Sequence, residues 1–230
     1  MSDVFTLQDS LALSDLTTYL GRAARVEDGS VRLIANGNIL AVYVAVIYPA
    51  GLLDESPTVL GLRTFALPNA DTFDVVVPVA SMLSRLERAG NDTRDVAETV
   101  RVSIPMQVNS VTWAAISPPR GGWTPLPTTS AATLEGVARA GIDEVATAIP
   151  TGTGEQIVHK VRSEVWGRPI AGLEHVPAGA AFAALSLGFL STNEQGGEEP
   201  VTIFETGPWT RVTTKRGHVL IKRRAWSIAR

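Results

Sequence analysis

The sequence predicts an α+β protein built from two units. In the N-terminal half, the apolar residues follow a period of two in some segments and of 3.6 in others, which indicates an antiparallel sheet with two helices. The C-terminal half carries the pattern of three helices followed by a small β-hairpin. Residues 118–129 between the halves are rich in proline, glycine and threonine, a composition typical of a linker. We therefore expect domains at 1–117 and 130–230.

The composition excludes several classes of chemistry. Of the 230 residues, 45% are hydrophobic and 19% are charged, as expected for a packed globular protein. The chain has no cysteine, which excludes disulfides, thiolate catalysis and iron–sulfur clusters. Its three histidines do not stand at the spacing of metal ligands. We expect neither a metal nor a cofactor.

The N-terminus and the apolar segments indicate a cytoplasmic protein with no membrane span. The first ten residues, MSDVFTLQDS, lack the basic start and the apolar run of a secretory signal. The two most apolar segments, residues 39–48 and 177–190, are too short to cross a bilayer of about 30 Å as a helix. The excess of arginine over lysine, 17 to 3, is typical of a bacterium with a G+C-rich genome.

The N-terminal half begins with a helix and a hairpin. Leucine spacing predicts a helix over residues 14–25 with Ser14 as its cap, and one earlier turn is compatible with the pattern. Val31–Ala35 and Ile39–Ile47 flank Asn36-Gly37, a dipeptide that favours a two-residue hairpin turn. We therefore expect two short antiparallel strands there.

The rest of the N-terminal half is predicted to supply more strands and a second helix. Pro78 opens the helix, whose apolar stripe ends at the stop signal Gly90. The strands are expected where alternating apolar residues are bounded by turn residues: 58–67, 73–77, 98–104 and 111–116.

In the C-terminal half, helix caps define the first two helices. Ser130 caps a helix that runs to about Ala148, although two glycines inside it weaken its helix propensity. Thr153 and Gln156 form a capping-box pattern for a helix that ends at Trp166. The third helix is the apolar segment 177–190, and strands follow at 201–205, 209–214 and 219–224.

The third helix, with the sequence PAGAAFAALSLGFL, carries no charge and must be covered on every face. Its large apolar side chains are Phe182, Leu185, Leu187 and Phe189. Either they form the core of the C-terminal unit, or they lie in the interface of a homo-oligomer, which we expect to be a dimer. The identity of any other protein partner is left open.

The C-terminal end of the chain is basic. The chain has 20 basic and 23 acidic residues, but seven of the basic residues and none of the acidic ones follow Glu205. The part up to Glu205 therefore has a net charge of −10 and the remainder +7. Such asymmetry favours an anionic partner for the tail or docking of the tail on an acidic surface.

The order of elements from Ser130 to Arg224 resembles the winged-helix arrangement. The resemblance implies nucleic-acid or anion contacts by Lys215, Arg216 and His218 in the wing and by Arg211, Lys222, Arg223 and Arg224 on the strands beside it. Two features disagree: the third helix offers no Arg, Lys, Asn or Gln to base edges, and ten residues rather than a tight turn precede it. Any nucleic-acid contact is therefore expected to be independent of base sequence, and a solvated basic hairpin is the alternative.

No catalytic constellation stands out in the sequence. Residues 151–155, TGTGE, precede a helix but lack the lysine of a phosphate-binding loop. His159 and His175 have no partner at a ligand spacing, and no Gly-x-Ser-x-Gly elbow is present. We expect a non-enzymatic, self-associating interaction protein. The alternatives are a nucleic-acid-binding regulatory module and a small-ligand binder or enzyme with its site between the two units.

Overall fold

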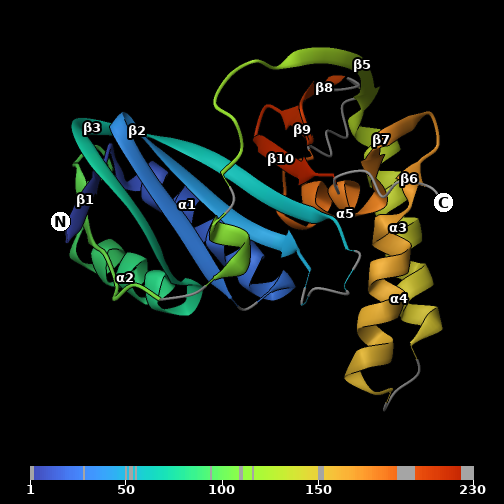
Figure 1. Ribbon diagram of the computed structural model, residues 1–230. Coiled ribbons are helices and arrows are strands. Elements are labelled where there is room, and N and C mark those ends of the chain that lie inside the picture. Colours follow the sequence, from blue (N-terminus) through green and yellow to red (C-terminus); the bar gives the residue numbers. More distant parts are fainter. Residues whose placement is uncertain are drawn as a thin grey trace. The chain divides into compact units, whose positions relative to one another are not determined.

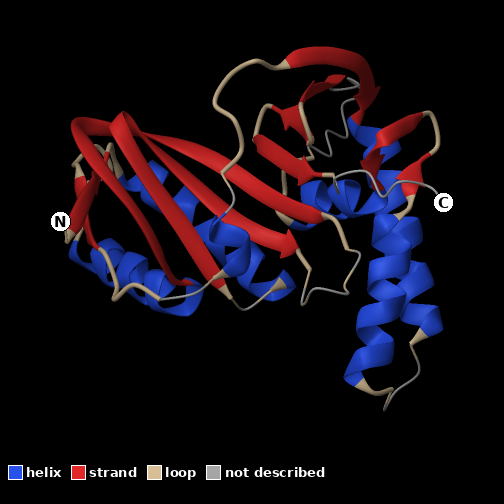
Figure 2. Cartoon of the chain, viewed as in Figure 1, coloured by secondary structure: helices blue, strands red, loops and turns tan. Residues whose placement is uncertain are grey.

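The chain forms two compact units in a computed structural model, shown in Figures 1 and 2. Unit 1 comprises residues 1–45 and 62–117, and unit 2 comprises residues 46–61 and 118–230. That the units fold as independent domains stays a prediction. The structure describes residues 3–27, 29–49, 51, 54, 56–93, 95–108, 111–115, 117–149, 153–190 and 200–223.

Unit 1 combines strands with two α-helices. Its short strands β1 and β4 pair antiparallel, with Val4 opposite Ser103, and its long strands β2 and β3 are neighbours in a second sheet. The elements of the unit are β1 (Val4–Leu7), α1 (Ser10–Val26), most of β2 (Ser30–Ile47), most of β3 (Thr58–Pro78), α2 (Val79–Asp92), β4 (Val100–Ser103) and the 3-10 helix η1 (Thr112–Ala115).

Both helices of unit 1 begin where local chemistry allows it. The Asp9 carboxylate accepts a hydrogen bond from the Ala12 N–H at 2.8 Å, so α1 starts one turn before the predicted cap. Pro78 precedes the first turn of α2, as predicted. The two helices pack on one another and bury Leu16, Leu20 and Met82 completely. Each such side chain contributes about 1.5 to 3 kcal/mol of burial free energy.

The predicted reversal of the chain at Asn36-Gly37 agrees with the structure, although both arms belong to one element, β2, in which Gly37 has a φ of +62°. The ribbon of β2 turns back on itself (Figure 1). The hydrogen-bonded Asp74 and, in addition, the nearby Tyr43 raise the pKa of Arg32, whereas eleven residues of straight strand would separate Tyr43 from Arg32 by about 36 Å. The Asn38 side chain donates to the carbonyl of Leu67 on the neighbouring strand at 3.1 Å. The dipeptide therefore supplies the residue with positive φ at which the chain reverses. The strands predicted at 58–67 and 73–77 are likewise one strand, β3.

The strand predicted at 111–116 is also wrong. Residues 112–115 form η1, in which the successive residues Trp113 and Ala114 are both buried. A strand cannot bury two successive side chains on one face because they point to opposite sides. Arg32 of β2 holds η1 in place: its guanidinium donates to the Ala114 carbonyl at 2.6 Å and to both carboxylate oxygens of Asp74 at 2.8 and 2.6 Å.

Unit 2 is built on antiparallel strands whose order in the sheet differs from their order in the chain. The sheet has the order β2-β3-β10-β9-β8-β5, and the last residues of β2 and the first of β3 belong to unit 2. The other elements are β5 (Thr124–Ser130), α3 (Ala131–Ala148), α4 (Glu155–Gly167), β6 (Pro169–Ile170), β7 (Leu173–Pro177), α5 (Ala178–Ser186), β8 (Pro200–Thr206), β9 (Trp209–Thr214) and β10 (Gly217–Lys222).

The α+β class is confirmed, but a winged-helix arrangement is not. The predicted wing, β9 and β10, lies inside the sheet between β3 and β8 instead of standing as a free hairpin. The β6–β7 hairpin separates α4 from α5, so the three helices do not follow one another (Figure 2). The physical reason is that β10 finds a further partner in β3, far earlier in the sequence. Residues 124–130, partly in the predicted linker, form the edge strand β5.

In unit 2, α3 begins at its predicted cap, but α4 does not. Gly154 is the N-cap of α4 and no side-chain hydrogen bond among the described residues caps the helix, so the predicted capping box of Thr153 and Gln156 is not formed. The Ser130 hydroxyl accepts from the Thr133 N–H at 3.0 Å and caps α3, as predicted. α5 is shorter than predicted because Gly188 adopts a φ of +72°, and the Phe189 N–H donates to the Ala184 carbonyl at 2.8 Å. This is the Schellman ending of a helix. None of the helices within the described residues is long and apolar enough to cross a membrane.

Candidate functional sites in unit 2

The side chains of β8, β9 and β10 divide the sheet of unit 2 into two faces. Val212 on β9 lies between Ile203 of β8 and Val219 of β10, and these three side chains are at most 1% exposed. Phe189 also lies on this buried face, against Gly217. Cross-strand partners share a face, so the register assigns the alternate residues to the opposite one. That second face, here called the Arg211 face, consists of Thr202, Phe204, Thr206, Trp209, Arg211, Thr213, His218, Leu220 and Lys222.

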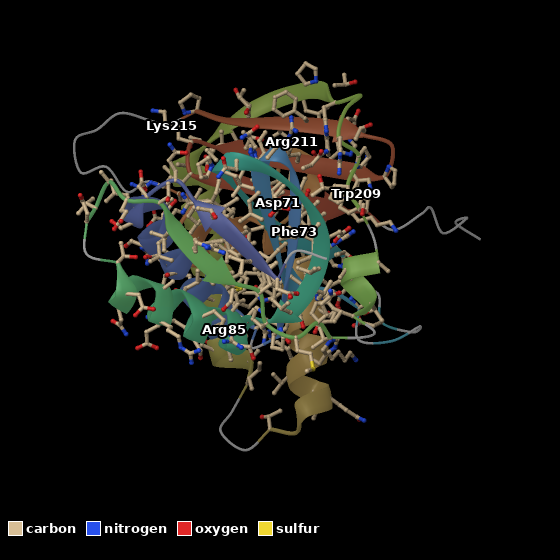
Figure 3. The ribbon with its side chains drawn as sticks, turned by 90° about the vertical axis from the view of Figure 1, so that its left-hand side faces the viewer. Asp71, Phe73, Arg85, Trp209, Arg211 and Lys215 are labelled. Atoms are coloured by element: carbon tan, nitrogen blue, oxygen red, sulfur yellow. The ribbon has the colours of Figure 1, made fainter. Side chains whose placement is uncertain are left out.

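Arg211 is the central charged residue of this face (Figure 3). Its guanidinium carbon lies 4.5 Å from the ring centroid of Trp123 and 4.7 Å from that of Phe204, so both aromatic rings contact the cation. The Trp123 indole N–H donates to the Pro119 carbonyl at 3.2 Å, which fixes the ring. Burial lowers the pKa of Arg211, although the group stays charged at any ordinary pH.

His218 lies diagonally across from Arg211 on the same face. Its Nδ1 is 3.0 Å from the hydroxyl of Thr213, its direct cross-strand partner. Burial and, second, the positive charge of Arg211 lower the pKa of His218 below 6.5. His218 is therefore neutral at neutral pH and adds a hydrogen-bonding group, not a charge, to the site.

The other predicted anion-contact residues do not form one cluster. Lys215 and Arg216 are exposed in the turn between β9 and β10, and Lys222 is half-buried at the end of β10. Arg223 is occupied within the chain: its guanidinium donates to the carbonyl of Gly207 at 2.9 Å and contacts Glu205 and His175. Arg224 lies outside the described residues. That any of these residues binds nucleic acid stays a prediction.

The apolar helix α5 is largely covered by unit 2 itself. Leu187 and Phe189 are each 1% exposed, and the alanines of the helix are buried against α3 and β10. Phe182 stacks on Trp166, with ring centroids 4.4 Å apart, and Leu185 is half-buried. Leu187 and Phe189 are therefore core residues of unit 2 in this geometry, which is the first of the two predicted alternatives. A contact of these side chains with another copy of the chain stays a prediction.

A polar pocket of about 620 Å³ lies beside α4. On one wall, Nε2 of His159 is 3.3 Å from the Asp54 carboxylate. On the other, the Ser56 hydroxyl donates to the Ser163 hydroxyl at 2.7 Å. Within the described residues, no hydrogen bond joins His159 to Ser163, so the geometry lacks the nucleophile–base pair of a hydrolase. Among the same residues, no group of three or more His, Asp or Glu could hold a metal ion.

Trp123 and Phe204 were not predicted as components of the Arg211 site. Trp123 was placed in a linker, because proline and glycine surround it. Pro125 of β5 pairs with Phe204 of β8, and Trp123 stands two residues before Pro125, so Trp123 lies on the same face as Phe204 and Arg211. Its position on this face follows only from the strand register. Asp54 was not predicted as a site residue either, although its side chain is only 10% exposed.

The arrangement of strands and helices is similar to that of DNA polymerase sliding clamps. A DnaN sliding clamp (DNA polymerase III subunit beta) from Bartonella birtlesii, bound to griselimycin, matches with a TM-score of 0.51 and 12% identity over 98% of this chain and 66% of the clamp. The DNA polymerase III subunit beta from Pseudomonas aeruginosa gives 0.50 and 14% identity over the same shares. The protein therefore has a sliding-clamp-like fold and spans just under two thirds of the length of these clamps.

Two family models match successive parts of the chain. Residues 1–107 match a model described as "Domain of unknown function (DUF8010)", and residues 118–226 match one described as "Domain of unknown function (DUF8185)". The gap between the two matches contains Ser117, the last residue of unit 1. None of the curated proteins matches the chain.

Proposed function

We propose that this protein is a non-enzymatic interaction protein with a sliding-clamp-like fold and that it self-associates. The similarity of the fold over 98% of the chain supports the proposal, since the matched clamps are described as subunits of DNA polymerase III. The polar pocket beside α4 argues in the same direction, because its His159 pairs with Asp54 and, among the described residues, has no hydrogen bond to a nucleophile.

The surface that we assign to self-association lies on α3 and α4, and its exposed apolar side chains are the observation that carries the proposal. Ile142 on α3 is 39% exposed and Ile157 on α4 is 58% exposed. Ile142 stands six residues before the end of α3 and Ile157 two residues after the start of α4, so both lie toward the connected ends of the two helices. Isoleucine is among the residue types most often buried, and two exposed copies on neighbouring helices favour an interface.

The charges beside the two isoleucines favour a second copy of this chain as the partner. Asp143 follows Ile142 on α3, and Lys160 stands one turn after Ile157 on α4; both are exposed. In a two-fold interface the same surface meets itself, so Asp143 of one copy can pair with Lys160 of the other. Self-association through α3 and α4 therefore joins apolar contact with complementary charge.

The test is the mass of the protein in solution, measured by size-exclusion chromatography with light scattering between 1 and 100 μM. The wild type is expected to form a dimer, and Ile142→Ser with Ile157→Ser to shift its dissociation constant upward by about tenfold or more. Met106→Ser is the matched control, because Met106 belongs to unit 1 and is 89% exposed. A wild-type protein that stays monomeric over this range would disprove self-association.

A second candidate function is nucleic-acid binding that does not depend on base sequence. It is supported by the exposed Lys215 and Arg216 in the β9–β10 turn and by the matched structures, which are described as DNA polymerase sliding clamps. It predicts that a labelled DNA duplex binds more weakly at 200 mM than at 50 mM salt and that Lys215→Glu with Arg216→Glu abolishes binding. Fluorescence anisotropy measures both effects, and absence of binding at 50 mM salt excludes this function.

A further inference from the structure

Arg211 is a cation whose N–H groups have no hydrogen-bond acceptor among the described residues. Its Nε is fully buried without a hydrogen-bond partner, and none of the described residues accepts a hydrogen bond from its guanidinium or forms an ion pair with it. The flanking rings of Trp123 and Phe204 contact the guanidinium but accept no N–H hydrogen bond in the plane of the group. A buried donor without a partner is costly, so such a group in a native structure calls for an explanation.

The described strand residues that share a face with Arg211 include no carboxylate. In the described strands, the nine residues of the Arg211 face include three basic ones, Arg211, His218 and Lys222, and no acidic one. The acid closest in the register, Glu205, belongs to the opposite face and contacts Arg223. An anion for Arg211 must therefore come from outside this face.

We propose that the Arg211 face binds a carboxylate side chain of an acidic segment in a partner protein. Stacking between Trp123 and Phe204 leaves the planar N–H edge of the guanidinium as its recognition element, and two parallel N–H groups match the two oxygens of a carboxylate. The Thr213 hydroxyl and the neutral His218 ring lie beside it and supply further polar contacts. The two rings add apolar contact for the rest of the segment.

The charge pattern favours a protein carboxylate over the phosphates of a nucleic acid. Binding along a phosphate backbone depends on several cations in a row, whereas this site has one arginine set between two aromatic rings. His218 is neutral beside it, because its pKa is lowered, and the whole chain has a net charge of −3. This binding goes beyond self-association and uses a different part of unit 2 from Ile142 and Ile157.

The experiment uses the full chain and a fluorescein-labelled hexaglutamate peptide as the probe. Anisotropy measures affinity, and two-dimensional NMR follows the Arg211 side-chain Nε–Hε signal and the pKa of His218. We expect the peptide to shift the Arg211 signal and to raise the pKa of His218, because a nearby carboxylate favours the charged imidazole. Arg211→Gln should weaken binding about tenfold or more. Arg216→Gln, with the same change of charge in the exposed turn, should alter it less than twofold.

Three outcomes would overturn the proposal. One is hexaglutamate that leaves the Arg211 signal unmoved. Another is an equal loss of affinity in Arg216→Gln, which shows attraction to net charge alone. The third is a single-stranded DNA of twelve nucleotides that shifts the Arg211 signal at lower concentration than the peptide, which assigns the site to phosphates.

If Arg211→Gln fails to fold, Trp123→Leu replaces it, since it removes one stacking ring from a half-buried position. Unchanged peptide affinity in Trp123→Leu also refutes the site. A monomeric protein that passes these tests disproves self-association but not this site.

Discussion

The two glycines within α3 should respond in opposite ways to the same substitution. Alanine in place of an exposed helical glycine stabilises a helix by about 1 kcal/mol, because it restricts the unfolded chain and improves helix propensity. At Gly136 an added Cβ meets no atom within 4 Å, so Gly136→Ala should gain this amount. At Gly141 the added Cβ would overlap the Trp166 ring, 2.8 Å from its Cη2 and closer still to its Cζ3.

The magnitude at Gly141 follows from how little Trp166 can move. Its ring is 3% exposed and stacks on Phe182, with centroids 4.4 Å apart. Overpacking of a filled core costs about 1 to 3 kcal/mol. Since helix propensity contributes equally to both variants, the difference between their free energies of unfolding isolates that steric cost: Gly141→Ala should be about 1 to 3 kcal/mol less stable than Gly136→Ala.

Urea unfolding followed by circular dichroism at 222 nm measures the difference between these variants. A double-mutant cycle with Trp166→Leu provides the control, since the penalty of Gly141→Ala should largely disappear once the ring is gone. Equal stabilisation by Gly141→Ala and Gly136→Ala would refute the close approach of α3 to Trp166, and with it the packing of this core.

Three further predictions concern buried or paired groups. Arg32→Lys should lower the free energy of unfolding by about 1 to 3 kcal/mol in urea titrations, because lysine cannot bind Asp74 and the Ala114 carbonyl together; Glu135→Gln at the exposed pair with Arg139 should change it by less than about 0.5 kcal/mol. His218 has a folded-state pKa below its unfolded value of 6.5, so its contribution to stability is present above that pH and lost as the pH falls below it; between pH 7.5 and 5.5 the melting temperature should fall more in the wild type than in His218→Gln, and equal falls would contradict the burial of His218. Phe189→Ala should cost about 3 to 5 kcal/mol in urea unfolding, clearly more than Leu185→Ala at a half-buried position; equal losses would place Phe189 outside the core.

Local signals predicted most of the helices of this protein. The cap at Ser130 and the helix after Pro78 are where the sequence places them, because a cap or a proline acts over a few residues and needs no tertiary partner. The start of α1 was missed by one turn because Asp9, Ser10 and Ser14 are all acceptable caps by residue type. The backbone geometry selects Asp9, whose carboxylate reaches the Ala12 N–H.

The candidate site was predicted only in part. Arg211 and His218 were identified as possible anion contacts from the charge of the C-terminal end, and both lie on the Arg211 face. The same reasoning gave equal weight to Arg223, which donates to the Gly207 carbonyl and contacts Glu205 through its Nη2. Charge can be counted along a sequence, but the availability of a charged group depends on which chain segments fold against it.

By itself, the sequence determined the α+β class, the positions of the major helices and the segments that form β8, β9 and β10, because periodicity, caps and turn residues act within a few residues of one another. Only the tertiary structure decided how the strands pair. β10 joined the sheet through β3 instead of forming a wing. Trp123 and Arg211 meet for the same reason: strand pairing joins distant segments, and the free energy of that pairing depends on side-chain packing that local patterns do not encode.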